Sequence, residues 1–121
     1  MSDNLRVLVV DDVPDMREIL ERFIEVFGLE VITAGSGKDG LALFRENEID
    51  LIITDIMMDD GDGFELVQGA RKINPDVRVI FITGYEVDDA RQRAADLGAD
   101  GFLSKPFSIK ELKELIDGMT P

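Results

Sequence analysis

Short apolar runs alternate with longer amphipathic stretches along this chain. Three of the runs are nearly unbroken β-branched or aliphatic stretches, which is typical of parallel strands covered on both faces. The pattern predicts five strands, at residues 6–10, 30–33, 51–54, 79–83 and 101–104.

Helical spacing follows each predicted strand. The clearest helix has Pro14 in its first turn and Gly28 at its end, both favoured positions for these residues. Its apolar positions are Met16, Ile19, Leu20, Phe23, Ile24 and Phe27. Further helices are predicted at 38–47, 64–73 and 88–97. The last begins at Ser108 with Glu111 three positions on, the pattern of a capping box, and its apolar positions are Ile109, Leu112, Leu115, Ile116 and Met119.

The helix predicted at 88–97 differs from the others in its apolar stripe. The stripe is made of Val87, Ala90, Ala94 and Leu97, which are mostly small side chains. Because small side chains bury little apolar area, we expect this helix to be the least firmly held.

Five alternating strands and helices with short connections imply right-handed crossovers. The predicted fold class is therefore α/β: a single-domain, doubly wound (βα)5 protein with a parallel five-stranded sheet and helices on both faces. In an open sheet of this kind, ligands bind outside the carboxyl ends of the strands.

Composition narrows the classes of function. The chain has 121 residues, enough for one domain with its own core, and a net charge of -13. This surplus disfavours binding to nucleic acid or to an anionic membrane surface. Cysteine and histidine are both absent, which excludes disulfides, Cys/His zinc sites and His-dependent catalysis. Without a signal-like segment or a long apolar run, a cytoplasmic location is expected.

Polar residues stand where the predicted strands end. Asp11 and Asp12 follow the first strand, Asp55 the third and Lys105 the fifth, while Thr83 closes the fourth. Because carboxyl ends of parallel strands share one edge of a sheet, these residues should converge there.

Three converging carboxylates repel one another unless a cation compensates them. Oxygen ligands alone select a hard ion, and Mg²⁺, with Mn²⁺ as an alternative, suits a site with few carboxylates and a phosphate. Thr83 can donate a hydrogen bond and Lys105 supplies a mobile positive charge. These are together the parts needed for phosphoryl transfer to an Asp side chain.

Four stretches of the sequence, in order and spanning nearly the whole chain, resemble the receiver domain of two-component response regulators. They are VLVVDDVPDMREIL, LIITDIMMDDGDGFEL, VIFITGY and GADGFLSKPF. The resemblance implies the flavodoxin-like strand order 2-1-3-4-5. Residues 1–121 would then be one receiver domain, and the chain contains no predicted output domain.

The resemblance also implies roles for individual residues. Asp55 would be the phospho-acceptor, and Asp11, Asp12, Asp55 and the backbone carbonyl of Met57 would hold Mg²⁺. Thr83 matches the switch hydroxyl and Lys105 the lysine that pairs with the phosphoryl group.

Further positions carry over in the same way. Phe102 stands at the position of the switch aromatic, and Met57 and Tyr85 stand beside the path of water to the phosphoryl group. A cis peptide is implied before Pro106. The chain departs from the family at Asp59, where a proline is usual, which leaves the shape of that loop open.

The predicted function is a phosphorylation-dependent signalling switch rather than an enzyme. Its implied partners are a sensor histidine kinase or histidine phosphotransfer protein, and an output domain or downstream protein on the face made by the fourth helix, fifth strand and fifth helix. A phosphorylation-dependent homodimer is a further implied assembly. Two alternatives remain at this point: a Mg²⁺-dependent phosphohydrolase with an aspartyl-phosphate intermediate, and a binding module that never uses phosphate.

Overall fold

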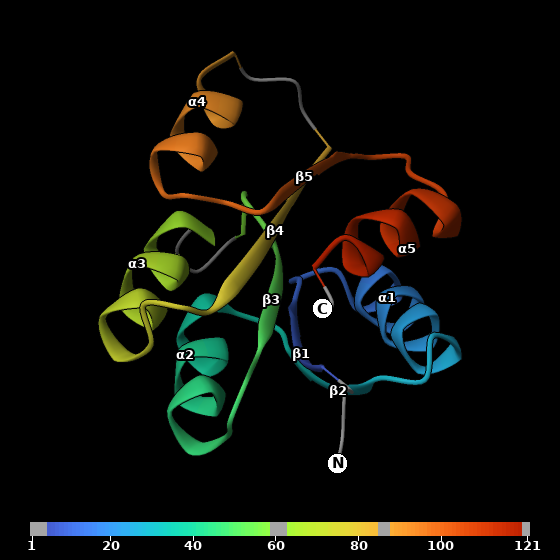
Figure 1. Cartoon of the computed structure of the whole chain (residues 1–121), viewed down its shortest axis with the longest axis horizontal. Helices are drawn as coiled ribbons and strands as arrows, with labels where there is room; N and C mark the ends of the chain where they lie inside the picture. Colours follow the sequence, from blue (N-terminus) through green and yellow to red (C-terminus); the bar gives the residue numbers. More distant parts are fainter. Residues whose placement is uncertain (1–4, 59–62, 85–87, 120–121) are drawn as a thin grey trace.

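The structure is a computed structural model of the whole chain, and it describes residues 5–58, 63–84 and 88–119. Within these residues, five strands and five helices alternate along the chain, and Figure 1 shows their arrangement. In chain order they are β1 (Arg6–Val10), α1 (Pro14–Val26), β2 (Glu30–Ala34), α2 (Gly37–Glu46), β3 (Leu51–Asp55), α3 (Gly63–Ile73), β4 (Arg78–Thr83), α4 (Asp88–Asp96), β5 (Gly101–Ser104) and α5 (Ile109–Asp117).

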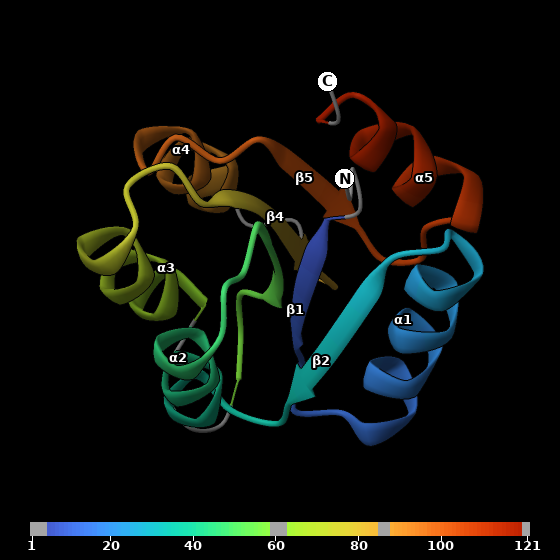
Figure 2. The ribbon, with the colours of Figure 1, turned by 60° about the horizontal axis from the view of Figure 1, so that its bottom comes forward.

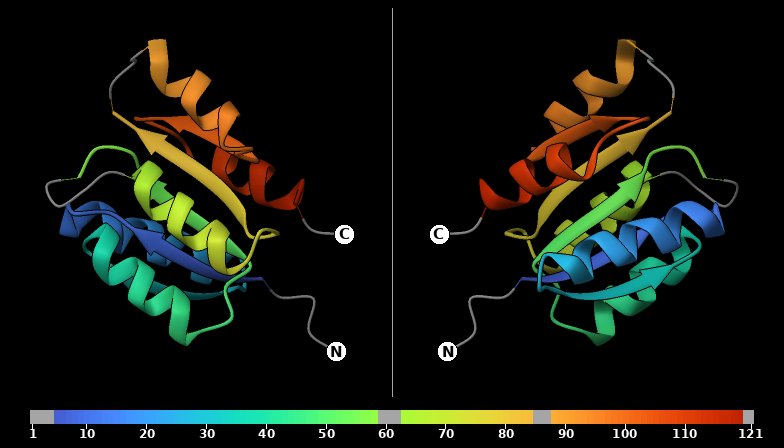
Figure 3. Two further views of the ribbon diagram at one scale, coloured as in Figure 1. Left: turned by 90° about the vertical axis from the view of Figure 1, so that its left-hand side faces the viewer. Right: turned by 90° about the vertical axis from the view of Figure 1, so that its right-hand side faces the viewer.

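All strands are parallel and lie in the order β2-β1-β3-β4-β5, which confirms the predicted fold class and strand order. The arrowheads of the strands point the same way in both views of Figure 3. Helices α1 and α5 cover one face of the sheet, and α2, α3 and α4 cover the other (Figure 2). The long apolar runs are explained by this double cover.

The core follows the two-residue period of the strands. On β3, Leu51 and Ile53 pack toward α1 and α5, while Ile52 packs toward α2 and α3, and all three are fully buried. Each such side chain contributes about 1.5–3 kcal/mol of hydrophobic stabilisation. The central strands therefore form a rigid base for the residues that follow them.

Helix ends match their sequence signals. Gly28 follows α1 in a left-handed conformation, with φ of +81°, which glycine adopts without strain. Ser108 caps α5, accepting from the Glu111 N–H at 3.1 Å, while the Glu111 carboxylate accepts from the Ser108 N–H at 3.2 Å. The predicted capping box is confirmed.

Two of the apolar positions in these helices are exposed. Ile19 of α1 is 44% exposed and Ile109 of α5 is 38% exposed. The buried stripe of α1 is centred on Leu20 and Ile24, four residues apart, and Ile19 lies outside it. Ile109 is the first residue of α5, and the buried part of that helix comes later, at Leu112.

The described helices are all short relative to a bilayer. Among them, none combines the length and the apolar character needed to cross a membrane.

Candidate functional site

The backbone brings four of the predicted site residues to one edge of the sheet. Asp55 is the last residue of β3 and is paired with Ile82, one position before Thr83 at the end of β4. Asp11 follows β1, and Lys105 follows β5, where its N–H donates to the Thr83 carbonyl at 2.7 Å.

Lys105 joins the two buried carboxylates. Its Nζ donates to Asp55 Oδ2 at 2.6 Å and lies 3.5 Å from Asp11 Oδ2. The side chains of Asp11 and Asp55 are 0% and 8% exposed, whereas that of Lys105 is 20% exposed. The sequence prediction that these side chains converge is met for all three.

Burial raises the pKa of Asp11 above its ordinary value of 3.8, because neither the Val13 N–H nor the Lys105 charge offsets the lost hydration. Burial acts to lower the pKa of Lys105, but the hydrogen bond and charge of Asp55, with a smaller contribution from Asp11, outweigh it. The pKa of Lys105 is therefore raised above 10.5. Lys105 therefore stays protonated at neutral pH, whereas the charged form of Asp11 is destabilised by its burial.

Asp11 is oriented from several sides. Its Oδ1 accepts from the Val13 N–H at 2.9 Å, and its own N–H donates to the Ala34 carbonyl at 3.2 Å. Arg17 of α1 donates from Nη1 to the Asp11 carbonyl at 2.8 Å. Only Oδ2 has no hydrogen bond, and it faces Lys105.

Arg17 is a site residue that sequence reasoning missed. A Cβ at Gly35 would lie 3.1 Å from Arg17 Nη1, so the absent side chain makes room for the guanidinium. The sequence holds the two signals, an arginine six residues after the aspartate and a glycine just past the second strand, but neither is specific alone.

The backbone around Asp55 is fixed by hydrogen bonds and by a close approach of Gly63. The N–H of Ile56 donates to the Ile82 carbonyl at 3.0 Å, and the N–H of Gly63 donates to the Ile56 carbonyl at 2.8 Å. A Cβ at Gly63 would collide with the Asp55 carbonyl oxygen, so only glycine permits this close approach.

A pocket of about 370 Å³ opens above Asp55. It is lined by Asp12, Val13, Asp55, Met57, Gly84 and Lys105. The Met57 N–H donates to Asp55 Oδ1 at 3.1 Å, and its side chain is 60% exposed at the mouth. Tyr85 and Asp59, which the sequence analysis also singled out, lie outside the described residues.

Thr83 and Phe102 share one face of the sheet. Thr83 is paired with Ser104, and Phe102 lies two residues before Ser104, so their side chains point to the same side. Thr83 is buried and Phe102 is half-buried against the α3 and α4 side of the core. The peptide between Lys105 and Pro106 is cis, as the resemblance implies.

The donor atoms suit a hard cation. Asp11 Oδ2 is a buried oxygen without a hydrogen bond, and the pocket beside it is lined by Asp12 and Asp55. Within the described residues, however, no three acidic side chains already stand close enough to hold a metal ion. The residues fit Mg²⁺ by chemistry, and binding would require the carboxylates to draw together in place of their contacts with Lys105.

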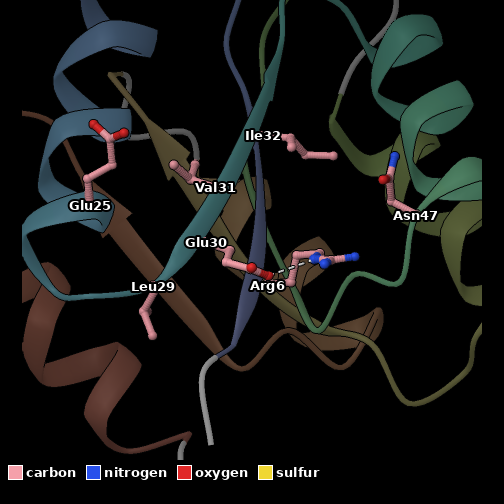
Figure 4. A pocket seen from close by; sticks show the side chains of 7 residues that line it. All are labelled: Arg6, Glu25, Leu29, Glu30, Val31, Ile32 and Asn47. Carbon is pink, nitrogen blue, oxygen red and sulfur yellow. Dashed lines mark hydrogen bonds and ion pairs between the residues drawn. The ribbon is translucent and has the colours of Figure 1, made fainter. Parts of the chain in front are cut away.

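A second pocket, of about 440 Å³, lies at the opposite end of the fold from this chemistry. It flanks β2, the edge strand, and Figure 4 shows its labelled side chains Arg6, Glu25, Leu29, Glu30, Val31, Ile32 and Asn47. Arg6 Nε donates to Glu30 Oε2 at 2.9 Å across it, so its central charges are paired. It lacks the convergent carboxylates of the other pocket.

A sheet in this order, with carboxylates and a lysine at its carboxyl edge, matches the arrangement that the sequence resemblance implies. The chain belongs to the response regulator receiver domain family, whose model matches residues 7–117. It is 42% identical over 112 residues to a probable transcriptional regulator, ycf27, of Porphyra purpurea. That match covers 92% of this chain and 45% of the relative, so the chain spans about half the length of the curated relatives it matches.

Solved structures give the same result. A CheY-like receiver domain protein from Methanospirillum hungatei JF-1 superimposes with a TM-score of 0.90 at 30% identity, over 95% of this chain and 92% of that one. The response regulator TrrA of Thermotoga maritima, in complex with Mg²⁺ and beryllium fluoride, gives a TM-score of 0.85 at 35% identity, over 94% and 97% of the two chains.

Proposed function

We propose that Asp55 is the residue that accepts the phosphoryl group in this receiver domain. The observation that carries the proposal is the 2.6 Å contact between Lys105 Nζ and Asp55 Oδ2 at the base of an open pocket, with Asp11 on the other side of the lysine. A carboxylate that is slightly exposed, held by its backbone and paired with a cation has the position that a phospho-acceptor requires.

In the proposed reaction, an Asp55 carboxylate oxygen attacks the phosphorus of a partner's phosphohistidine. A P–O bond forms, the P–N bond breaks, and its electron pair stays with the imidazole nitrogen, which takes up a proton. Water later cleaves the acyl phosphate and restores the carboxylate with release of inorganic phosphate. These 121 residues contain no histidine, which supports a donor outside them.

Lys105 would move with the transferred group. Its Nζ already reaches both carboxylates, so a short displacement brings it onto a phosphoryl oxygen. Burial raises the pKa of the Asp11 carboxylate, so a cation brought near it would stabilise its charged form.

Mg²⁺ would be held by Asp11, Asp12, Asp55 and the Met57 carbonyl. When bound, the ion neutralises charge on the transferring oxygens. Mn²⁺ offers the same hard-ligand chemistry. The role of the protein is to hold the carboxylates at a fixed strand edge and to position Lys105 and Thr83 around the phosphoryl group.

The response to phosphorylation would start at Thr83 and Lys105. Both can bind the new phosphoryl oxygens, and Thr83 is buried on the same sheet face as Phe102. Movement of Thr83 toward Asp55 would open space for the Phe102 ring and change the surface of α4, β5 and α5. An output domain or downstream protein, or a second copy of the chain, would bind that surface.

We further propose that residues 1–121 act as one receiver domain in the cytoplasm, with a sensor histidine kinase or histidine phosphotransfer protein as donor. A phosphohydrolase is disfavoured by the residues beside the acceptor. The two that follow Asp55 are Ile56, which is buried, and Met57, and neither supplies a second acid or base.

The proposed acceptor is tested by mass spectrometry after incubation with acetyl phosphate and Mg²⁺. The wild type should gain one phosphoryl group, and Asp55→Asn should gain none while keeping its fold. Asp50→Asn is a matched control, because Asp50 is exposed and lies just before β3, where it accepts from the Arg6 N–H. Phosphorylation of Asp55→Asn would overturn the assignment.

A further inference from the structure

Arginine contacts help to attach helix α4 to the rest of the domain. In its described part the buried apolar side chains are Ala90 and Ala94, which bury little area. Two of its own arginines lie over aromatic rings: Arg91 over Phe102 of β5, with Cζ 4.6 Å from the ring centroid, and Arg93 over Phe64 of α3, at 4.2 Å.

A third arginine holds the other end of the helix. Arg71 of α3 donates from Nη1 to the Leu97 carbonyl at 2.7 Å and from Nη2 to the Gly98 carbonyl at 3.2 Å, just past the end of α4. Gly98 has φ of +71°, and a Cβ there would lie 3.0 Å from Arg71 Nη1. The carboxyl end of α4 is therefore fixed to α3.

These three contacts differ in what they touch. Phe64 is buried, and its ring centroid lies 4.9 Å from that of Phe81 of β4 in a tilted arrangement, so the Arg93 contact is with a ring of the buried core. Phe102, by contrast, is half-buried on the edge strand β5. The Arg91 contact is the one that a movement of Phe102 would break.

We propose that Arg91 is a positioning residue that holds Phe102 in its unphosphorylated orientation through a cation–π contact. This inference rests on the proposed function, in which Phe102 moves toward Thr83 when Asp55 carries a phosphoryl group. Because the contact exists in the resting arrangement and is lost on movement, it lowers the affinity of the site for a phosphoryl group.

The direction of the change in anion affinity distinguishes the proposed role of Arg91 from a simple charge effect. Removing a positive charge near an anion-binding site weakens anion binding at long range. Removing the contact of Arg91 with Phe102 should instead strengthen it, by about three-fold for an exposed cation–π contact. Tighter binding after loss of a cation is therefore specific to the proposed role.

The experiment measures binding of beryllium fluoride in excess Mg²⁺ by ¹⁹F NMR. Arg91→Gln should bind beryllium fluoride about three-fold more tightly than the wild type, which corresponds to the energy of the lost contact. Arg91→Lys keeps the positive charge, so its affinity should lie close to that of the wild type. Arg93→Gln is the matched control, since it removes the same charge from the same helix and the same type of contact, but from a ring in the buried core. It should not tighten binding.

A double variant tests whether the effect depends on the Phe102 ring. In Phe102→Leu, which lacks the ring, adding Arg91→Gln should give no further tightening. Unchanged or weaker binding in Arg91→Gln, equal tightening in Arg93→Gln, or full tightening without the ring would each overturn the inference. If the wild type itself failed to bind beryllium fluoride, the proposed function would fail first, and the inference with it.

Discussion

Arg17 and Asp11 are joined through the backbone, by the 2.8 Å hydrogen bond from Arg17 Nη1 to the Asp11 carbonyl oxygen. The contact ties α1 to the end of β1, the strand that the proposed metal-binding pair follows. The proposed ligand Asp11 is thus aligned by a side chain six residues further along the chain.

We predict that Arg17→Met weakens Mg²⁺ binding by about three- to ten-fold, which corresponds to loss of one hydrogen bond that aligns a ligand. Titration calorimetry on the folded protein measures the dissociation constant. Arg22→Met is the control, because Arg22 lies on the same helix and pairs with Glu18 on the surface. If the role of Arg17 were only structural, Arg17→Met would lower the stability of the protein and leave its Mg²⁺ affinity unchanged.

Asp11→Asn should raise the free energy of unfolding at neutral pH without Mg²⁺, because it removes a buried charge and keeps the Oδ1 acceptor. The pKa of Asp11 is raised in the folded state, so its ionisation destabilises the fold at pH above that pKa. Below 3.8 it is protonated in both states, and the difference between variant and wild type should vanish. Urea unfolding at several pH values measures this, and an advantage that persists at low pH would contradict it.

Lys105→Gln should destabilise the metal-free protein by about 2 kcal/mol, because Asp55 and Asp11 lose the cation that lies between them. The pKa of Lys105 is raised by folding, so its stabilisation is complete below 10.5 and is lost as the pH rises through the folded value. Mg²⁺ should bind the variant more tightly than the wild type, since a competing cation has been removed. Equal Mg²⁺ affinities by calorimetry would contradict that competition.

The acyl phosphate of this protein should be long-lived. Met57 is exposed at the mouth of the pocket and lacks a group that could orient water. Met57→Glu should shorten the lifetime about ten-fold or more by supplying such a group. Loss of radiolabelled phosphate over time measures it, with Ile73→Glu, an exposed apolar residue at the end of α3, as the charge-matched control. A wild-type half-life of seconds in Mg²⁺ would refute the prediction.

Amide hydrogen exchange should be faster in α4 than in α1. Helix α4 buries only Ala90 and Ala94 in its described part, whereas α1 buries the larger Leu20 and Ile24. Exchange monitored by mass spectrometry or NMR would show this difference. Equal protection of the two helices would mean that the arginine contacts of α4 hold it as firmly as apolar packing holds α1.

The fold was predictable because its signals are local and repeated. The run at 51–54 is apolar at every position up to Thr54 and lies between two paired strands, so double burial follows from the pattern. The convergence of Asp11, Asp55 and Lys105 followed in turn from strand direction alone. The individual roles of these residues remain predictions.

Contacts between side chains of different helices and strands could not be predicted from the sequence. Ile19 matches the apolar spacing of α1 and is nevertheless exposed, since the buried stripe is narrower than the apolar one. Arg91 reads as a solvated surface residue, and its stacking on Phe102 depends on how α4 crosses β5. Similarly, the space that Gly35 leaves for the Arg17 side chain is seen only when β2 and α1 are placed side by side.

The close approach of Gly63 to the Asp55 carbonyl has a mechanical consequence. The Ile56 N–H donates to the Ile82 carbonyl and the Gly63 N–H to the Ile56 carbonyl, so the backbone of Asp55, the proposed acceptor, would have little room to move on gaining a phosphoryl group. The added volume and charge would then be accommodated by the residues that line the pocket, most of which follow other strands. In the proposed switch, a fixed acceptor would therefore shift the movement to the surrounding loops, where a partner could detect it.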